Sequence, residues 1–526
     1  MIERGQTNKN LPLILIILDG WGIASPNSGN AISLAKTPFM DGVVKKYPST
    51  QIYAHGRYVG LPNDQDGNSE AGHMNIGAGR IVEQDSVKIN NSIKDGTFFK
   101  NAAFAEAISR VKKNKSKLHL MGMLSNGMSA HSNPDHVSAL LKLARTNNIN
   151  NTNIHLFTDG RDSPKYAALK LVESLLRELS GNERIATIMG RFYAMDRKKK
   201  WSRTKMAYEA LVLGKGLKAK SPQEAITQSY NREENDEFIR PYVIYKDNKP
   251  LPRINNGDSV IFFNFRSDRA RQLAKVFVQE KFNEDNPGSF KKEKVLKNLY
   301  FVTMTDFGPD LDSIKTAFPS MDLKDTLPMV LANLKQLYLA EREKYAHVTY
   351  FFNGGYAGRV NGEDCFMIPS PDVRSYDEKP AMSSSKLASV VIKNIKEKKY
   401  DFTVLNFAAP DMIGHTGNLK AGVICCEAID KEVNNITKEY LKKNGTVIIT
   451  ADHGNIEEMI NLKTGEIDTE HSKNPVPFII INKKLKRTIK LRKNGVLGDI
   501  APTILYLMDR KKPKEMKGKS LIDRAW

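Results

Sequence analysis

Three short apolar segments, widely separated in the chain, each end close to an acidic residue. They are residues 13–18 before Asp19, residues 402–407 shortly before Asp411, and residues 446–451 before Asp452 and His453. Their length and their β-branched side chains predict buried strands. In open α/β sheets, ligands bind in the crevice beyond the carboxyl ends of the strands. The sequence therefore predicts an α/β fold with carboxylate and imidazole groups at these strand ends.

Histidines accompany these carboxylates in a pattern that suits a metal centre. Carboxylate oxygen and imidazole nitrogen together suit manganese, zinc or iron, whereas oxygen ligands alone suit magnesium or calcium. Asp411 and His415 are four residues apart, so one helical turn could direct both at one ion. Taken singly, this pair is better explained as solvated, and His471 as a loop histidine. Together with Asp452 and His453 at a strand end, they predict a metal site.

A serine lies among small residues in the segment 68–80, which reads NSEAGHMNIGAGR. Metal coordination can activate a serine hydroxyl as a nucleophile. If a helix starts at Ser69, its first amides favour an anion such as phosphate. Judged alone, Ser69 is better explained as the N-cap of a helix through Met74. The Gly77-Ala78-Gly79 pattern does not predict a dinucleotide site, because no apolar strand precedes it and the third glycine is missing.

Longer segments of the chain carry a resemblance to one family. Besides the segments above, they are residues 18–22, 157–162, 190–197, 263–271, 343–355 and 410–417. With them the chain resembles, over nearly its whole length, the cofactor-independent phosphoglycerate mutases of the alkaline phosphatase superfamily. The resemblance implies interconversion of 3-phosphoglycerate and 2-phosphoglycerate, in glycolysis and gluconeogenesis, without a bisphosphoglycerate cofactor. It also implies a two-domain α/β fold, in which an α/β phosphotransferase domain is inserted into an alkaline-phosphatase-like metal-binding domain.

The resemblance assigns two divalent metal ions and a phosphoserine intermediate to this chain. The ligands of one ion would be Asp411, His415 and His471, and the other ion would be surrounded by Asp19, Ser69, Asp452 and His453. Ser69 would be the nucleophile that takes the phosphoryl group. Manganese is preferred from the mixed nitrogen and oxygen ligands and from the resemblance, with cobalt, magnesium or zinc as alternatives.

The resemblance also assigns a set of substrate-binding residues, most of them cationic. They are His131, Arg161, Asp162, Arg191, Arg197, Arg266, Arg269 and Lys344. Guanidinium groups bind phosphate and carboxylate bidentately, so such a set suits a phosphoglycerate. Asp162 would carry the proton between the two hydroxyls of glycerate. Without the family, Arg266 and Arg269 would be explained as an ordinary basic loop.

The positions of these residues predict the domain organisation. A chain of 526 residues exceeds what one core usually serves. The expected metal ligands lie before about residue 80 or after about residue 400, and the arginines lie between. We therefore expect a discontinuous metal-binding domain, residues 1–83 and 319–526, and an inserted substrate-binding domain, residues 84–318. Helical stretches at 166–179 and 384–396 indicate α/β structure in both. A surface excursion is expected at 283–289 and a return linker within 309–319.

Composition narrows the class and the location of the protein. No apolar stretch approaches the roughly 18 residues that a membrane helix needs. The first residues lack the apolar region of a secretory signal. The chain has only three cysteines, Cys365, Cys425 and Cys426, and the two neighbours would pair only with strain. We therefore expect a cytoplasmic protein, and a monomer, since the family suggests one and no coiled-coil heptads occur.

The formal net charge of +21, from 80 Lys+Arg against 59 Asp+Glu, is not explained by the family. A basic balance can attract nucleic acid, membranes or anionic metabolites. The basic clusters lie at 197–200, 291–292, 396–399, 483–490 and 510–519. Because they are dispersed and lack interleaved aromatic residues, solvated faces are the better interpretation. Binding of RNA or an anionic surface stays a secondary hypothesis, which the absence of RNA retention at physiological salt would dismiss.

A few positions depart from the family pattern. Asn126 stands where the family usually has an aspartate followed by a glycine pair, and the segment before His131 is one residue longer. Ala409 replaces an asparagine before Asp411, and Ser472-Lys473 replace a threonine pair after His471. These changes predict altered rates or metal preference and not a lost site.

Two other classes of function are open to this chain. A phosphatase or a phosphopentomutase of the same superfamily would share the metal ligands but need not have the arginine-rich middle domain. The segments around Arg161, Arg191, Arg266 and Lys344 favour the mutase. A non-catalytic binding protein would not need all the ligands and the serine together.

Overall fold

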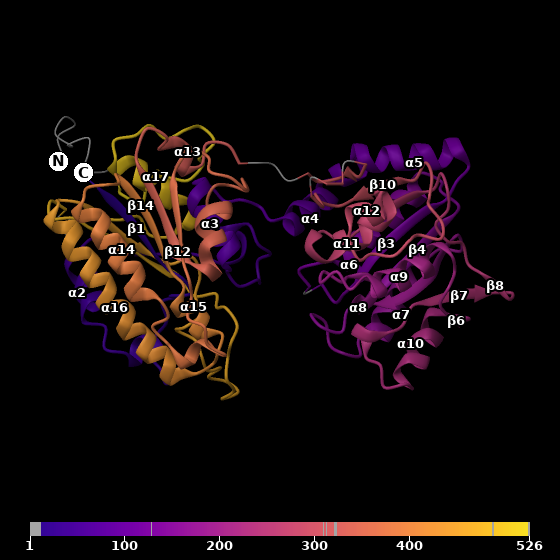
Figure 1. Cartoon of the computed structure of the whole chain (residues 1–526), viewed down its shortest axis with the longest axis horizontal. Helices are drawn as coiled ribbons and strands as arrows, with labels where there is room; N and C mark the ends of the chain where they lie inside the picture. The colour runs from indigo at the N-terminus through magenta and orange to yellow at the C-terminus, as the bar shows by residue number, and fades with distance from the viewer. Residues whose placement is uncertain are drawn as a thin grey trace. The chain divides into compact units, whose positions relative to one another are not determined.

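The computed structural model describes residues 12–127, 129–308, 310–311, 313–319, 323–485 and 489–523. Pro309, at the start of the expected return linker, lies outside this range. The chain forms two compact units, Met1–Gln84 with Asp322–Trp526 (unit 1) and Asp85–Met321 (unit 2) (Figure 1). Each unit contains its own sheet and its own core. In the described residues, no helix is long and apolar enough to cross a membrane.

Unit 1 is built on an eight-stranded sheet. Its order is β13 (Asp364–Ile368), β12 (Gln336–Glu341), β14 (Phe402–Phe407), β1 (Leu13–Leu18), β15 (Thr446–Thr450), β16 (Val476–Ile481), β2 (Ser49–Tyr53) and β17 (Gly495–Val496). Only the pairings of β16 with β15 and β2 are antiparallel. All residues of β1 and β14 are buried, as in parallel strands covered on both faces. The three predicted strands are confirmed, the last ending one residue earlier than expected.

Helices cover this sheet. One group consists of α2 (Pro38–Lys46), α14 (Ser384–Lys396) and α16 (Leu419–Lys442). Helix α16 contacts both α2 and α14, and each of the three contacts strands of the sheet. A second group consists of α3 (Ser69–Ala78), α13 (Leu327–Val330) and α17 (Ile500–Leu507). Figure 1 shows strands β1, β12 and β14 between the pair α14 and α16 and the helix α3. The helix expected at 384–396 is confirmed as α14.

Unit 2 is built on a nine-stranded sheet. Its order is β11 (Lys315–Thr316), β10 (Tyr300–Thr303), β9 (Ser259–Phe262), β3 (Leu118–Leu124), β4 (Thr152–Thr158), β5 (Glu183–Gly190), β7 (Tyr242–Lys246) and β6 (Leu217–Ala219), and β8 (Lys249–Pro250) pairs with β7. The pairings of β7 with β5 and β8 are antiparallel. The three cysteines of the chain, all in unit 1, are free thiols.

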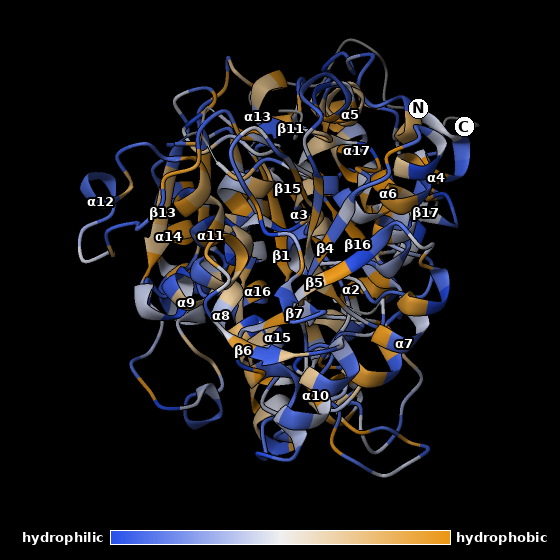
Figure 2. Ribbon diagram, turned by 90° about the vertical axis from the view of Figure 1, so that its right-hand side faces the viewer, coloured by the Kyte–Doolittle hydropathy of each residue, from blue (hydrophilic) through white to orange (hydrophobic). Residues whose placement is uncertain are grey.

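Two apolar cores lie on the two faces of this second sheet. Successive residues of a strand point to opposite faces, so Leu118 and Leu120 of β3 join one core while Met121 and Met123 join the other. The helices of the first face are α5 (Ala102–Asn114), α6 (Pro134–Thr146) and α7 (Ala168–Glu178); those of the second are α9 (Trp201–Val212) and α11 (Ser267–Val278). In Figure 2, α7 carries orange and blue segments because only one of its faces is apolar.

The remaining α-helices complete the two units. They are α1 (Ala31–Leu34), α4 (Asp85–Asp95), α8 (Arg191–Ala194), α10 (Pro222–Tyr230), α12 (Phe282–Asp285) and α15 (Ala409–Gly414). The segment 283–289 was expected to be a surface excursion. It is largely exposed, but it begins within α12, and the side-chain amide of Asn286 is buried and donates to the Phe282 carbonyl, 2.7 Å away.

Candidate active site

The acidic residues of unit 1 converge because their strands are neighbours. β1 pairs in parallel with β14 on one side and β15 on the other, so Leu18 lies opposite Phe407 and Ile17 opposite Thr450. Asp19 directly follows β1, and Asp452 and His453 follow β15. Asp411 lies in α15, just beyond β14. The sheet thus brings three carboxylates together at the carboxyl ends of its central strands, although Asp19 and Asp452 are more than 400 residues apart in the chain.

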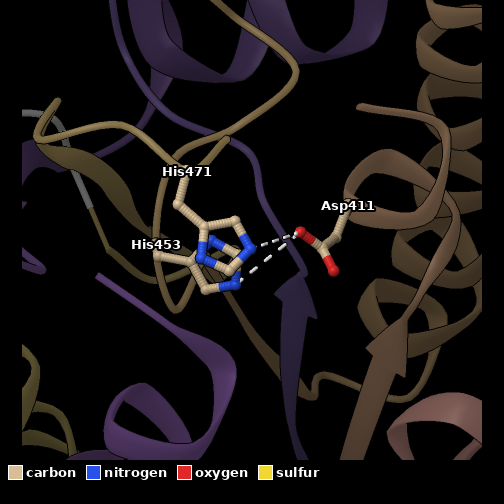
Figure 3. Close-up of side chains that lie close together, drawn as sticks. All are labelled: Asp411, His453 and His471. Carbon is tan, nitrogen blue, oxygen red and sulfur yellow. Dashed lines mark ion pairs between the residues drawn. The ribbon is translucent and has the colours of Figure 1, made fainter. Parts of the chain in front are cut away.

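Asp411 faces three histidines. Its Oδ1 atom lies 3.3 Å from His471 Nε2, 3.4 Å from His415 Nε2 and 3.9 Å from His453 Nε2. Figure 3 shows the imidazoles of His453 and His471 directed at this carboxylate. Asp19 and Asp452 form a second group around the same His453. The two groups of possible metal ligands therefore meet at His453, although the resemblance assigns this residue to one ion.

The histidines are held with their Nε2 atoms toward the centre. His415 Nδ1 lies 2.8 Å from the Thr469 carbonyl, His471 Nδ1 lies 2.8 Å from the Gly67 carbonyl, and His453 Nδ1 lies 3.2 Å from the Gly454 carbonyl. A carbonyl only accepts hydrogen bonds, so Nδ1 of each ring carries a proton, and Nε2 is the atom that can bind a metal once it is unprotonated. The Nε2 atoms of His415 and His471 lie 3.1 Å apart. Two lone pairs that face each other at this distance repel unless a cation or a proton lies between them.

The buried charges of this cluster also fit divalent cations. Asp19, Asp411 and Asp452 are buried, and Lys344 is their one close lysine or arginine partner among the described residues. Asp452 Oδ2 is buried and accepts no hydrogen bond, although His73 Nδ1 lies 3.1 Å away. Burial alone lowers the pKa of His453, but the nearby carboxylates, led by Asp452, outweigh burial and raise it to about 9. The donors are nitrogen and oxygen, as manganese, zinc or cobalt prefer, so the residues present fit such ions.

Ser69 lies inside this cluster. Its Oγ is 2.6 Å from Lys344 Nζ, 2.9 Å from His453 Nε2 and 3.1 Å from Asp19 Oδ1, to which it donates. Lys344 Nζ also lies 2.6 Å from Asp19 Oδ1 and from Asp411 Oδ2. Burial alone would lower the pKa of Lys344, but Asp19 and Asp411 outweigh it and raise that pKa well above its usual value. Lys344 is therefore a fixed cation beside the serine hydroxyl.

Ser69 does not cap α3, so its hydroxyl is available for the contacts with Lys344, His453 and Asp19. The interpretation of Ser69 as an N-cap is wrong, because Asn68 is the cap and its side chain accepts from the Ala71 amide at 2.9 Å. Ser69 is the first residue of the helix, and the helix continues to Ala78 instead of ending at Met74. A Cβ at Gly72 would lie 2.6 Å from the Asp452 carbonyl, so glycine permits the close approach of α3 to this strand end.

The expected substrate residues of unit 2 form a second polar group. Arg191 is buried, and its Nη1 lies 2.5 Å from Asp159 Oδ1 and 2.9 Å from Asp162 Oδ2. Ser129 Oγ donates to Asp162 at 2.7 Å. Burial raises the pKa of Asp162, but the bonds from Ser129 and Arg191 outweigh burial and lower it. Asp162 is therefore an anion that can accept a proton.

Asp268 connects further members of this group. It lies 2.6 Å from Arg197 Nη1, 3.4 Å from Arg266 Nε and 3.7 Å from His131 Nδ1. Burial lowers the pKa of Arg269, and the positive charges of Arg191, Arg197 and Arg161 lower it further. Burial together with Arg191 lowers the pKa of His131 to about 4. Unit 2 thus gathers seven of the eight expected substrate residues, whereas Lys344 lies in unit 1 against Ser69.

Several residues of both groups escaped the sequence analysis. Asn406 Nδ2 donates to Asp19 Oδ2 at 2.6 Å, and Asn455 Nδ2 donates to Asp411 Oδ1 at 3.0 Å. The Asp159 carboxylate accepts from the amides of Asp162 and Ser163 at 3.1 and 2.9 Å. A signal existed for Asn406, because it is the one amide side chain within a strand of apolar and β-branched residues. The others stood in polar motifs, where sequence alone does not tell a positioning side chain from a solvated one.

Two of the positions that depart from the family pattern have clear surroundings. The backbone amide of Asn126 donates to Ser163 Oγ at 3.1 Å, and the side-chain oxygen Oδ1 of Asn126 accepts from the same hydroxyl at 3.1 Å. Asn126 therefore contacts the loop that carries Asp162. Ala409 is fully buried in α15, two residues before Asp411.

Comparisons with known proteins find relatives over nearly the whole chain. A family model described as the BPG-independent PGAM N-terminus matches residues 89–309. The 2,3-bisphosphoglycerate-independent phosphoglycerate mutase of Clostridium kluyveri is 48% identical over 515 residues, which cover 97% of this chain and 99% of the relative. The mutase of the same name from Clostridioides difficile is 47% identical over 518 residues, covering 98% and 99%.

A solved structure extends the agreement to three dimensions. The phosphoglycerate mutase of Leishmania mexicana, determined at low cobalt concentration, is 29% identical, with a TM-score of 0.71 over 98% of each chain. The expected two-domain α/β fold is confirmed by the two units of the chain and by its similarity to this structure. So is the expected activity, the interconversion of 3-phosphoglycerate and 2-phosphoglycerate without a bisphosphoglycerate cofactor. On these grounds the chain belongs to the family of 2,3-bisphosphoglycerate-independent phosphoglycerate mutases.

Proposed function

We propose that Ser69 is the nucleophile of this mutase and carries the phosphoryl group between the two hydroxyls of glycerate. The observation that supports this role most strongly is the position of Ser69 Oγ, within 3.1 Å of Lys344 Nζ, His453 Nε2 and Asp19 Oδ1. Asp19 accepts the hydroxyl hydrogen bond and so orients Oγ. Lys344 stabilises the negative charge that develops on Oγ as the proton leaves.

The proposed metal ligands are the residues that converge beyond the carboxyl ends of β1, β14 and β15. They are Asp411, His415 and His471 for one ion, and Asp19, Ser69, Asp452 and His453 for the other. Two bound divalent cations would neutralise charge on the transferring phosphoryl oxygens. The mixed nitrogen and oxygen donors support manganese as the physiological metal, with cobalt, magnesium or zinc as alternatives. The cobalt named for the Leishmania mexicana structure is consistent with a first-row metal.

The arginine group of unit 2 holds the glycerate part of the substrate in this proposal. Its members are His131, Arg161, Arg191, Arg197, Arg266 and Arg269. Lys344, in unit 1, is proposed as a substrate-binding residue beside Ser69. Fixed guanidinium groups bind a carboxylate bidentately. Asp162 takes the proton from the hydroxyl that attacks the phosphoserine and passes it to the hydroxyl that lost the phosphoryl group. Its lowered pKa keeps the carboxylate ionised, which is the form that can take up a proton.

This division of labour gives each domain its role. Residues 1–83 and 319–526 form the metal-binding domain that transfers the phosphoryl group, and residues 84–318 form the inserted domain that binds the substrate. Glycerate has to stay bound while the phosphoserine persists, because its loss to water would turn the enzyme into a phosphatase. We further propose that the protein is cytoplasmic and monomeric. For a monomer, light scattering of the purified protein should give a mass near 59.1 kDa.

Turnover of 3-phosphoglycerate, coupled to enolase and without bisphosphoglycerate, tests the proposal. The protein is assayed with chelator, with manganese restored, and as the Ser69→Ala variant. We expect chelator to abolish the activity, manganese to restore it, and Ser69→Ala to be inactive. Phosphate release without isomerisation would instead assign a phosphatase, and full activity of Ser69→Ala would refute the nucleophile.

A further inference from the structure

A buried carboxylate lies behind the proposed metal ligands. Glu457, in the segment between β15 and β16, is fully buried. Its Oε2 accepts from the backbone amides of Gly22 and Asn455, each at 2.9 Å. Its Oε1 accepts from the Asn474 side-chain amide at 3.0 Å and from the Ser472 hydroxyl. Four donors therefore converge on one carboxylate.

These donors come from three segments, and each segment carries proposed metal ligands. Gly22 follows Asp19 by three residues, Asn455 follows His453 by two, and Ser472 directly follows His471. The backbone joins two of these segments independently, because the Ser472 amide donates to the Gly454 carbonyl at 2.9 Å. Among the described residues, the Glu457 side chain alone connects all three segments, through hydrogen bonds from Gly22, Asn455 and Ser472.

Glycines make the space that this carboxylate occupies. A Cβ at Gly22 would lie 2.2 Å from Glu457 Oε1, and a Cβ at Gly454 would lie 2.3 Å from the same atom. Side chains at either position would therefore collide with the carboxylate. Two glycines and four donors, contributed by separate segments, form a cradle fitted to Glu457.

The chemistry of the donors indicates a positioning role for Glu457. Among the described residues, no lysine, arginine or histidine forms an ion pair with it, so it is stabilised by neutral donors alone. Breaking such a network leaves several buried donors unpaired. Side chains that hold metal ligands in place typically change metal affinity about 10- to 100-fold when they are removed.

We infer that Glu457 is a positioning residue that fixes the three ligand-bearing segments, so that Asp19, His453 and His471 meet around the metal ions. Removal of Glu457 then weakens metal binding without removing a ligand. Because metal affinity and not the chemical step is affected, saturating metal restores turnover. The inference rests on the metal ligands proposed above.

Glu457→Ala and Glu457→Gln separate the carboxylate from the space it fills. Alanine leaves all four donors unpaired. Glutamine keeps its carbonyl for the two backbone amides, which can only donate, and turns its amide toward Ser472 and Asn474, whose side chains can also accept. We therefore expect Glu457→Gln to fall between the native protein and Glu457→Ala. Glu466→Ala is the matched control, because Glu466 is exposed in the same segment between β15 and β16.

The measurement is Mn²⁺ affinity and stoichiometry of the full chain by electron paramagnetic resonance, with kcat determined at limiting and at saturating Mn²⁺. We expect Glu457→Ala to weaken Mn²⁺ binding roughly 10- to 100-fold, Glu457→Gln to weaken it several-fold, and Glu466→Ala to leave it unchanged. The kcat of both Glu457 variants should return at saturating Mn²⁺.

Thermal unfolding of the metal-free proteins shows whether each variant folds. If Glu457→Ala does not fold, the Mn²⁺ affinity and kcat of Glu457→Gln test the inference. Unchanged Mn²⁺ affinity in a folded Glu457 variant would overturn the inference and leave the proposed function intact. A kcat that stays low at saturating Mn²⁺ would also overturn it, since the residue would then act on the chemical step. Absence of Mn²⁺ binding by the native chain would overturn the metal ligands and the inference together.

Discussion

The ammonium of Lys344 lies 2.6 Å from the hydroxyl of Ser69, although 275 residues separate the two in the chain. The contact forms because Lys344 ends a short 3-10 turn (Arg342–Lys344) directly after β12, and Ser69 begins α3. Asp19 and Asp411 hold the same ammonium at 2.6 Å each. A buried cation is thereby fixed beside the proposed nucleophile before substrate binds, and no reorganisation is needed to stabilise charge there.

Lys344→Met should lower kcat by roughly two to three orders of magnitude, the usual effect of removing one group that stabilises transition-state charge. The metal-free variant should also unfold more readily, because two buried carboxylates lose their partner. Steady-state kinetics and thermal unfolding check both effects. Arg342→Ala is the control, since Arg342 is exposed two residues away. An unchanged kcat in Lys344→Met would contradict the role given to the ammonium.

Metal affinity should fall in acid because His453 has to lose its proton to bind a metal. Nearby carboxylates, opposing the effect of burial, raise the pKa of His453 to about 9 in the metal-free site. Below this pKa the proton competes with the ion, so each pH unit should weaken binding by up to about tenfold. Mn²⁺ titrations at several pH values between about 6 and 9 measure the slope. An affinity independent of pH would exclude His453 as a ligand.

Unit 2 should lose stability in mild acid because of two buried histidines. His119 Nδ1 lies 2.9 Å from His155 Nε2, and His119 Nε2 lies 3.1 Å from Asp258. Burial lowers the pKa of both, and each lies below the unfolded value near 6.5. The unfolded chain therefore binds more protons, and stability falls as the pH drops below about 6.5, by at most about 1.4 kcal/mol per pH unit for each histidine.

Urea unfolding of the full chain between about pH 5 and 7.5, followed by a probe in unit 2, measures this dependence. His155→Leu should be less stable at neutral pH, because His119 and Thr187 lose a partner, but its stability should depend less on pH. An equal pH dependence in the native protein and in His155→Leu would show that other groups cause the acid sensitivity.

Asp162→Asn should reduce kcat by about 10²- to 10⁴-fold, the range of general acid–base catalysis, because asparagine cannot take up the proton. The amide retains the size of the side chain and can still accept from Ser129 and Arg191, so KM should change little. Enolase-coupled kinetics separate the two parameters. Asp135→Asn, an exposed change in the same unit, is the control. A raised KM with native kcat would assign Asp162 to binding alone.

The convergence of Asp19, Asp411 and Asp452 could be predicted because each of these carboxylates follows a strand that the sequence marks clearly. Residues 13–18 and 402–407 form strands with the expected bounds, and parallel neighbours necessarily place Asp19 near Asp411 and Asp452. The arginine set followed from the family motifs alone, since basic loop residues have no periodic signal that would indicate a site.

The rest of the site depended on contacts between distant segments. Glu457 stands beside Glu458, and a solvated carboxylate is the usual interpretation of such an acidic pair; its burial results from the segments that fold around it. The cap of α3 is Asn68 and not Ser69, a difference of one residue that sequence patterns do not resolve. The contact of Lys344 with Ser69 likewise has no local signature.

The phosphoserine itself tests the central claim most directly. The native protein with Mn²⁺ is mixed with 3-phosphoglycerate, quenched in acid within milliseconds and digested for mass spectrometry of the peptide that contains Ser69. We predict a phosphoryl group on Ser69 that appears within the first turnover and decays when substrate is exhausted, and no such peptide in Ser69→Ala. Native turnover without phosphorylation of Ser69, or with phosphorylation of another residue, would contradict the account.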